Sequence, residues 1–338
     1  MFNYYVAVDW AIANMAIARM TEKSDDIKVI DVPSSIKEMQ IYLKNLKGTI
    51  CLTFEETSTS QWLYTELKEY VDKLVVCDPY RNKLLSEGPK NDKIDAKKLV
   101  MLLRAGLLKE VFHSSDKFIE LRKIVSGYED TIKAGVRLKN QRSSMFRSVN
   151  KDHKKETELI IDADKFVLGG VDMQIKYYEA EKLRYKNEFA RLKKAHPEIK
   201  RLCDIPGIAD ISAVKLVARI VDANRFPNRN SFLSYCGLIK LEKMSGGKSY
   251  GKKTPRFCRP LKAVFKTAAL AAIDGDNECG DYCKYLIETK KYSDRNARHA
   301  LSRRIATITY GVMKGNIKYD ALKRRNNIER NKMDTSKT

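Results

Sequence analysis

The first third of the chain alternates short β-rich stretches with amphipathic helical stretches. Apolar side chains recur at every second position in the former and at every third or fourth position in the latter. Residues 48–56 are nearly continuously apolar, which is typical of a strand at the centre of a sheet. The predicted order is strand 4–10, strand 14–20, strand 27–32, helix 33–46, strand 48–56, helix 59–71, strand 73–79 and helix 92–108. Three strands followed by alternating helices and strands predict a ribonuclease H-like α/β domain.

The middle of the chain has long helical periodicity. Apolar positions at helical spacing predict one long helix over residues 115–149, whose exposed face is basic and includes Arg137 and Arg142. Residues 160–170 look irregular, and a second long helix then runs to His196, where the following proline ends it. The two helices predict either a coiled-coil hairpin or dimer stalk, or an intramolecular helical bundle.

The C-terminal part is predicted to be mainly helical. Within residues 204–220, a Pro-Gly turn at Gly207 separates a short helix from an Ala/Val-rich helix that contains Lys215. This is the pattern of a helix-hairpin-helix, in which backbone N–H groups and the helix N-terminus approach a phosphate. An ordinary helical turn is the alternative interpretation. The polar, basic end of the chain predicts a disordered tail.

These patterns predict an α/β-plus-α protein of four parts. Residues 1–113 form the α/β domain, 114–197 the long-helix region, 198–318 the C-terminal domain, and 319–338 the tail.

The amino-acid composition indicates which class of molecule the protein binds. The chain carries 65 Lys and Arg against 43 Asp and Glu, a formal net charge of +22, which indicates a polyanionic partner such as nucleic acid. No apolar stretch is long enough to span a membrane, and the opening residues predict no signal peptide. The seven cysteines lack paired or zinc-binding spacing, so we expect reduced thiols in a cytoplasmic protein.

Four carboxylates interrupt this basic background at related positions. Asp9 and Glu55 end the first and fourth predicted strands, which are neighbours in a ribonuclease H-like sheet. Asp92 and Asp95 lie three residues apart, so they share one face of the helix that follows the fifth strand. Such a set would repel itself without hard cations, which indicates a site for Mg²⁺, with Mn²⁺ as a substitute. The alternative is that Asp92 is a helix N-cap and Asp95 a partner of the helix dipole.

A basic glycine loop holds the second candidate for chemistry. Ser245 precedes two glycines, and a serine surrounded by cations can act as a nucleophile toward a phosphodiester. By itself the motif is also typical of a surface turn, and Ser249 is a nearby competitor. The predicted nucleic-acid contacts around it are Gly246, Gly247, Lys248, Lys252, Lys253 and Arg256.

The quoted motifs, in this order, resemble a known family. "VAVDWA", "TFEETSTSQWLY", "NDKIDAKKLVMLLRAGLL", "IPGIADISAVKLVARI" and "FLSYCGLIKLEKMSGGKSYGK" are similar to the insertion-sequence one-ten transposases, relatives of the Piv DNA invertases. Lys90-Asn91-Asp92 stands where the family usually has Lys-Thr-Asp, and Phe257 where a glycine is expected.

The resemblance implies a RuvC-like domain joined to a C-terminal transposase domain. It implies a DNA recombinase in which Asp9, Glu55, Asp92 and Asp95 bind metal and Ser245 forms a covalent link to DNA. It also implies donor and target DNA, a structured non-coding bridge RNA, and a dimer that becomes a tetramer in the synaptic complex. The alternatives are a RuvC-like hydrolytic junction resolvase, with water as the nucleophile, and a non-catalytic nucleic-acid-binding protein.

Overall fold

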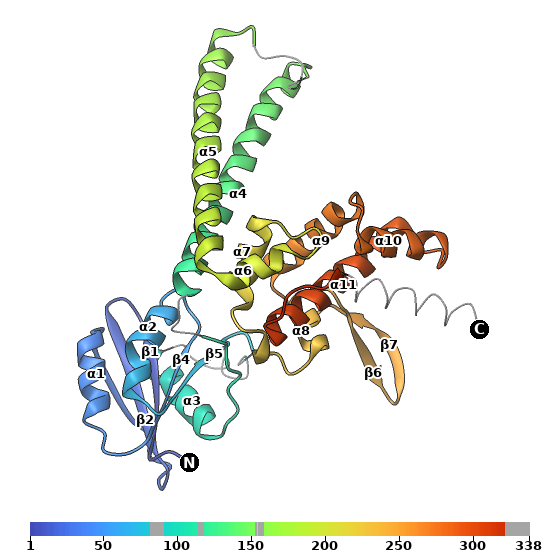
Figure 1. The fold of residues 1–338 in the computed structure, drawn as a ribbon. Coiled ribbons are helices and arrows are strands. Elements are labelled where there is room, and N and C mark those ends of the chain that lie inside the picture. Colours follow the sequence, from blue (N-terminus) through green and yellow to red (C-terminus); the bar gives the residue numbers. More distant parts are fainter. Residues whose placement is uncertain (82–90, 114–117, 153, 155–158, 322–338) are drawn as a thin grey trace, which may run out of the picture. The chain divides into compact units, whose positions relative to one another are not determined.

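The computed structural model describes residues 1–81, 91–113, 118–152, 154 and 159–321 (Figure 1). Contacts within the chain divide it into two compact units, Met1–Lys117 and Phe118–Thr338, and each is described by itself. The finer four-part division stays a prediction. Most of the predicted tail, residues 322–338, lies outside the described residues.

Unit 1 is built on a five-stranded sheet with the order β3-β2-β1-β4-β5 (Figure 1). The strands β1, β2 and β3 form an antiparallel meander, whereas β4 runs parallel to β1 and β5 parallel to β4. Their bounds are β1 Tyr4–Trp10, β2 Asn14–Thr21, β3 Lys28–Pro33, β4 Ile50–Glu55 and β5 Lys73–Cys77. This is the strand order and direction of a ribonuclease H-like domain, as the sequence pattern predicted.

Helices cover both faces of this sheet. They are α1 Ile36–Lys44, α2 Ser60–Leu67 with the short 3-10 turn η1 Lys68–Tyr70, and α3 Asp92–Arg104. Ser35 is the N-cap of α1, because its side chain accepts a hydrogen bond from the Glu38 N–H at 3.3 Å. Val6 and Val8 of β1 belong to the core under α1 and α2, whereas Tyr5 and Ala7 belong to the core under α3. Odd-numbered side chains of β1 therefore face α3.

Unit 2 is mostly helical. Its elements are α4 Phe118–Ser148, α5 Asp162–Ala195, α6 Pro197–Cys203, α7 Asp210–Ile220, η3 Ala223–Arg225, α8 Arg229–Tyr235, β6 Leu241–Ser245, β7 Lys248–Lys253, α9 Arg259–Ile273, α10 Glu278–Glu288 and α11 Asp294–Gly315. One hydrophobic core joins α6 to α11 with the adjacent ends of α4 and α5. In the part of the chain that the structure describes, no helix is long and apolar enough to span a bilayer.

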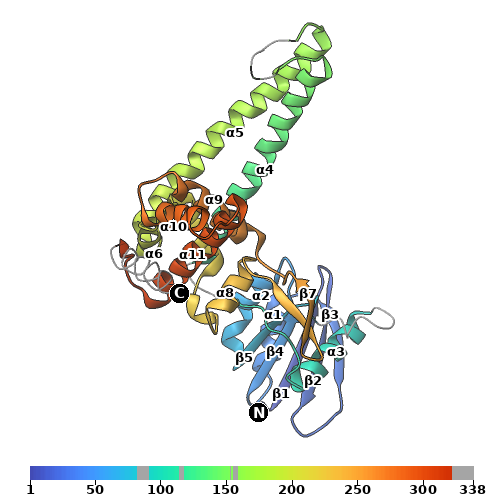
Figure 2. The same cartoon turned by 90° about the vertical axis from the view of Figure 1, so that its right-hand side faces the viewer.

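The helices α4 and α5 run side by side as a hairpin (Figure 2). Close contact depends on Gly135 of α4, because a Cβ there would lie 2.2 Å from the ring of Tyr178 on α5. The expectation of an irregular segment over residues 160–170 is wrong, since α5 already begins at Asp162. Two features stabilise the helix here and outweigh the helix-destabilising effect of the two glycines in this segment. They are the burial of Leu168 and Val171 and the acidic residues in the first turn of α5. Coiled-coil supercoiling of the pair stays a prediction.

Candidate active site and nucleic-acid contacts

The register of the sheet places Asp9 beside Glu55. Tyr4 of β1 pairs with Ile50 of β4, and Ala7 with Thr53, in a parallel ladder. Continuing this register by two residues brings Asp9 opposite Glu55. Successive side chains of a strand point to opposite faces of the sheet, and the odd-numbered residues of β1 and β4 pack under α3. Asp9 and Glu55 are odd-numbered, so both carboxylates lie on the α3 face of the sheet.

The first turn of α3 supplies the other two carboxylates. Asn91 is the N-cap of this helix, because its side chain accepts a hydrogen bond from the Lys93 N–H at 3.0 Å. The alternative that Asp92 caps the helix is therefore wrong. Asn91 stands where the resembled family usually has threonine, and both residue types suit the N-cap position. Asp92 is exposed and Asp95 half-buried, and buried Ala96 next to them packs this side of α3 against the sheet.

The four carboxylates interact through their charges. The pKa of Asp9 is raised from 3.8 to about 6, first by burial and then by the negative charges of Asp92 and Asp95. The pKa of Glu55 is raised by burial and then by Asp9 and Asp95. A carboxylate whose pKa rises in this way lacks a compensating positive charge in the folded protein. Two strands and one helix thus bring Asp9 and Glu55 within electrostatic reach of Asp92 and Asp95 at one edge of the sheet.

The four side chains are chemically suited to bind a hard divalent cation. They offer only carboxylate oxygens, which Mg²⁺ prefers, and a cation would remove the mutual repulsion. Among the described residues, however, no three carboxylate, imidazole or thiol side chains stand close enough to bind one ion together. The acids therefore lie within electrostatic reach of one another, although no three of them are gathered around one point in this arrangement of the side chains.

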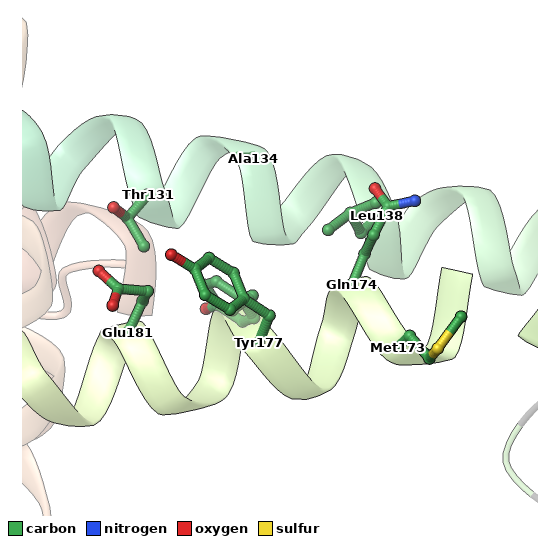
Figure 3. Close-up of a pocket in the computed structure, with 8 residues that line it drawn as sticks. Thr131, Ala134, Leu138, Met173, Gln174, Tyr177 and Glu181 are labelled. Carbon is green, nitrogen blue, oxygen red and sulfur yellow. The ribbon is translucent and has the colours of Figure 1, made fainter. Parts of the chain in front are cut away.

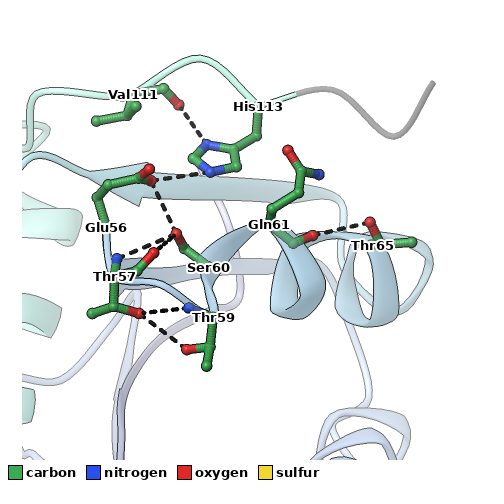
Figure 4. A network of polar contacts seen from close by, with 8 residues as sticks. All are labelled: Glu56, Thr57, Thr59, Ser60, Gln61, Thr65, Val111 and His113. Atoms are coloured by element: carbon green, nitrogen blue, oxygen red, sulfur yellow. Dashed lines mark hydrogen bonds and ion pairs between the residues drawn. The ribbon is translucent and has the colours of Figure 1, made fainter. Parts of the chain in front are cut away.

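Glu56, next to Glu55, belongs to a different network (Figure 4). Its Oε2 lies 3.0 Å from Nε2 of His113 and accepts a hydrogen bond from the Ser60 hydroxyl at 3.1 Å. The other ring nitrogen, Nδ1 of His113, lies 3.2 Å from the Val111 carbonyl oxygen, and the side chain is only 5% exposed. Of the two adjacent glutamates, only Glu55 is thus free for the acidic site. Sequence patterns had left His113 without a role.

Ser245 lies at the tip of an exposed hairpin in unit 2. It pairs with Lys248, and the two glycines between them have φ of 55° and 75°. Positive φ at both central positions defines a type I′ turn, which is the turn that best joins two antiparallel strands. Within the described residues no hydrogen bond to the Ser245 hydroxyl is found. The competitor Ser249 lies within β7, opposite Met244.

The predicted cations of this loop gather on the same hairpin. Lys248, Lys252 and Lys253 belong to β7 and are exposed, and Arg256 follows the strand with an exposed side chain. Lys252 lies 4.0 Å from Glu242 across the hairpin, a surface pair that adds little stability. The hairpin therefore presents its cations to solvent, where they can reach a phosphate backbone.

Two other predicted phosphate contacts, Lys215 and Gly207, have structural roles within unit 2. Lys215 Nζ lies 3.6 Å from Glu129 and 5.1 Å from the centre of the Tyr128 ring, between α7 and α4. A Cβ at Gly207 would lie 2.0 Å from the carbonyl oxygen of Ala268, so the close approach of α9 already requires glycine there. Their roles in binding nucleic acid stay predictions, as does the helix-hairpin-helix.

The two predicted arginines of the long helix differ in their contacts with the rest of unit 2. Arg142 donates to Asp172 of α5 over 2.8 Å and lies over the Phe146 ring, so it ties the hairpin together. Arg137 is exposed, and no ion pair or hydrogen bond to its side chain is found among the described residues. Arg137 is therefore the better probe of a nucleic-acid contact.

Phe257, the departure from the family pattern, has a packing role. Gly237 has φ of 67°, and a Cβ there would lie 2.4 Å from the Phe257 ring. Lys262 Nζ covers the same ring at 4.4 Å from its centre. The aromatic side chain thus closes the turn that leads into β6.

Comparison with known families covers both units. Residues 6–150 match a transposase family model, which includes all four carboxylates and implies a RuvC-like fold. Residues 199–284 match the model described as "Transposase IS116/IS110/IS902 family", which includes Ser245 and the β6–β7 hairpin. No curated protein matches the chain. The acidic edge of the sheet, the serine hairpin and these two matches together place the chain in the IS110 family of transposases.

Proposed function

We propose that this transposase cuts and rejoins DNA through a covalent bond between Ser245 and a DNA phosphate, with divalent metal ions held by Asp9, Glu55, Asp92 and Asp95. The single observation that carries the proposal is the convergence of these acids on one edge of the sheet, where burial first and then the neighbouring carboxylates raise the pKa of Asp9 and of Glu55. Transposases of this family are typically metal-dependent, and Mg²⁺ is the proposed ion, with Mn²⁺ as a substitute.

In the proposed step, Ser245 Oγ attacks a phosphorus of the DNA backbone. A P–O bond to the serine forms, the P–O bond to the leaving DNA oxygen breaks, and the serine proton passes through water to that oxygen, which leaves as a hydroxyl. In the reverse sense, a DNA hydroxyl attacks the phosphoserine bond and releases Ser245, so rejoining needs no ATP. Bound metal would supply Lewis-acid stabilisation of charge on the phosphate and the oxygens around it.

The exposed hairpin suits a serine that must reach a site outside its own unit. Since no described residue hydrogen-bonds the Ser245 hydroxyl, a general base is not built into the hairpin. Activation would come from the acidic site of unit 1, in the same chain or in a partner chain. Exposed Lys248, Lys252 and Lys253 would hold the DNA backbone next to the serine.

A structured bridge RNA is proposed as the guide that pairs with donor and target DNA. The family resemblance suggests it, and the exposed cations of the long helices, such as Arg137, offer a surface for it. Arg137→Glu should weaken RNA binding and flatten its salt dependence, and Arg142→Glu is unsuitable because it would also break the pair with Asp172. RNA affinity that is unchanged at low and moderate salt would move the RNA site elsewhere.

A dimer, and a tetramer in the synaptic complex, are proposed on the apolar surface of the long hairpin. Phe166, Met173 and Tyr177 are 84%, 68% and 70% exposed, and their spacing of seven and four residues repeats a coiled-coil seam. Figure 3 shows Tyr177 and Gln174 of α5 facing Ala134 and Leu138 of α4. These residues line an open hollow of about 530 Å³. Mass photometry with RNA and DNA tests the assembly, and a strictly monomeric active complex would refute it.

The hydrolytic alternative has one observation in its favour. The Ser245 turn is an ordinary type I′ geometry that a purely structural hairpin would also adopt. Water would then be the nucleophile, and the protein would resemble a junction resolvase.

Trapping the DNA adduct separates the two reactions. With Mg²⁺ present, a phosphoserine intermediate should appear as a slow band on a denaturing gel and as a modified Ser245 peptide in mass spectrometry. Ser245→Ala should abolish the band and recombination, whereas the neighbouring Ser249→Ala should retain both. Cutting by Ser245→Ala at the normal rate with free DNA ends would establish the hydrolytic reaction instead.

A further inference from the structure

A basic hollow lies between α9 and α11, and none of the residues that line it belongs to the proposed catalytic site. Its volume is about 220 Å³, and it is lined by Lys266, Leu270, Arg295, Arg298, His299 and Ser302. The spacing of these residues explains why they meet. Positions 295, 298, 299 and 302 share one face of α11, and positions 266 and 270 share one face of α9.

Positive charge in this hollow is largely uncompensated. Within the described part of the chain, no carboxylate forms an ion pair with Lys266 or Arg295, whereas Arg298 pairs with Asp294. Two further cations, Lys262 of α9 and Arg303 of α11, lie within electrostatic reach of the His299 ring. An anion entering the hollow would therefore meet several cations and a single opposing carboxylate.

The positive charges around the hollow also act on His299. Its pKa is lowered, first by burial and then by Lys266, Arg303, Lys262 and Arg295. Its Nδ1 atom is buried and has no hydrogen-bond partner among the described residues. Buried polar atoms are nearly always paired, so the unpaired Nδ1 of His299 leaves a hydrogen bond that a bound ligand can satisfy.

The lining also limits what the ligand is. Among the described residues, no Phe, Tyr or Trp lines the hollow, and four of its six lining side chains are basic, which suits a phosphate group better than a base. The Ser302 hydroxyl already donates to the Arg298 carbonyl oxygen at 2.9 Å. The volume of the hollow is large enough for one phosphate group with part of its hydration shell.

We propose that this hollow binds a backbone phosphate of a nucleic-acid strand, held by Lys266 and Arg295 with His299 beneath it. The inference rests on the proposed function only in taking nucleic acid as the ligand. It requires neither the Ser245 link nor the four carboxylates. Such a contact would position a strand on unit 2 without reading its sequence.

Binding measurements on the full-length protein test the proposal, with a labelled DNA duplex and a labelled stem-loop RNA as probes. The Lys266→Gln/Arg295→Gln double variant should bind one probe several-fold more weakly. On duplex DNA, the slope of log K against log salt should fall by about 0.9 for one lost phosphate. The charge-matched control is Lys284→Gln/Lys290→Gln, at exposed positions on and just after α10 that do not line the hollow.

The two probes distinguish the source of the phosphate. A loss confined to the duplex assigns the hollow to DNA, and a loss confined to the stem-loop assigns it to the guide RNA. A loss no larger than that of the control, on both probes, would show a general charge effect and overturn the proposal. Because only binding is read, failure of the Ser245 chemistry in the adduct assay would leave this result interpretable.

Proton uptake gives a second readout. Binding an anion raises the pKa of His299, so affinity should increase as pH falls from about 7.5 to 6 and the ring becomes charged. The other charged or titratable groups around the ring are the four cations named above, Asp294 in its pair with Arg298, and the Cys283 thiol of α10, whose pKa is raised by burial. His299→Gln should remove this pH dependence, and an unchanged dependence would take His299 out of the site.

Discussion

Replacing Asp9 by asparagine should stabilise the metal-free protein, although this residue is a proposed catalytic acid. The pKa of Asp9 rises from 3.8 to about 6, a difference of about 2 pH units. At about 1.36 kcal/mol per unit, that difference would correspond to about 3 kcal/mol for a group shielded from water. Asp9 is only half-buried, so solvent screening reduces the expected gain to about 1–2 kcal/mol.

The sign of the pH dependence follows from the direction of the shift. The folded pKa lies above the unfolded value, so the ionised carboxylate costs stability above about pH 6. As pH falls through 6 toward 3.8, the folded state binds the proton first and the cost disappears. The stability difference between Asp9→Asn and wild type should therefore be largest above pH 7 and vanish near pH 4.

Tryptophan fluorescence makes the assay specific to unit 1. The chain's two tryptophans, Trp10 and Trp62, both lie there, with ring centres 5.5 Å apart. Urea denaturation in EDTA, followed by this signal, measures the free energy of unfolding at each pH. Exposed Asp26, changed to asparagine, is the control and should shift stability by less than about 0.5 kcal/mol.

Metal should reverse the order of stability. Mg²⁺ that binds only the folded state stabilises wild type in proportion to RT ln(1 + [Mg²⁺]/Kd), and Asp9→Asn should gain less because it has lost a ligand. The reasoning is refuted if Asp9→Asn is less stable than wild type at pH 7.5 in EDTA, or if its advantage persists undiminished at pH 4.

Three further predictions concern unit 2. Gly135→Ala should destabilise by about 1–3 kcal/mol in urea denaturation, because its Cβ would overlap the Tyr178 ring at 2.2 Å. The control Gly169→Ala, where a Cβ meets nothing, should instead stabilise α5 by about 0.5–1 kcal/mol; equal effects of the two changes would contradict the close packing. Gly246→Val should abolish adduct formation while Gly246→Asn retains part of it, since φ of 55° is tolerated by asparagine and not by a β-branched residue; full activity of the valine variant would argue against the turn. Lys215→Ala should lower the thermal midpoint measurably, because it leaves a partly buried carboxylate with one cation fewer; unchanged stability with weaker DNA binding would restore Lys215 as a phosphate contact.

Local patterns in the sequence determined the sheet and its acidic residues. Alternating apolar positions set the strands, and the order of strands and helices allowed one arrangement of neighbours, so Asp9 and Glu55 were expected at adjacent strand ends. The spacing of Asp92 and Asp95 likewise predicted their common helix face. These inferences succeed because strand alternation and helix periodicity depend on residues close together in the chain.

The tertiary structure decided which of several equivalent side chains is available for function. Glu55 and Glu56 look alike in the sequence, but His113, more than fifty residues away, engages only Glu56. Lys215 looks like any other helix cation until Glu129 of α4 is found beside it. The basic hollow around His299 depends on the packing of α9 against α11, which no local pattern specifies. In each case the partner lies far away in sequence, and only folding brings its charge close enough to matter.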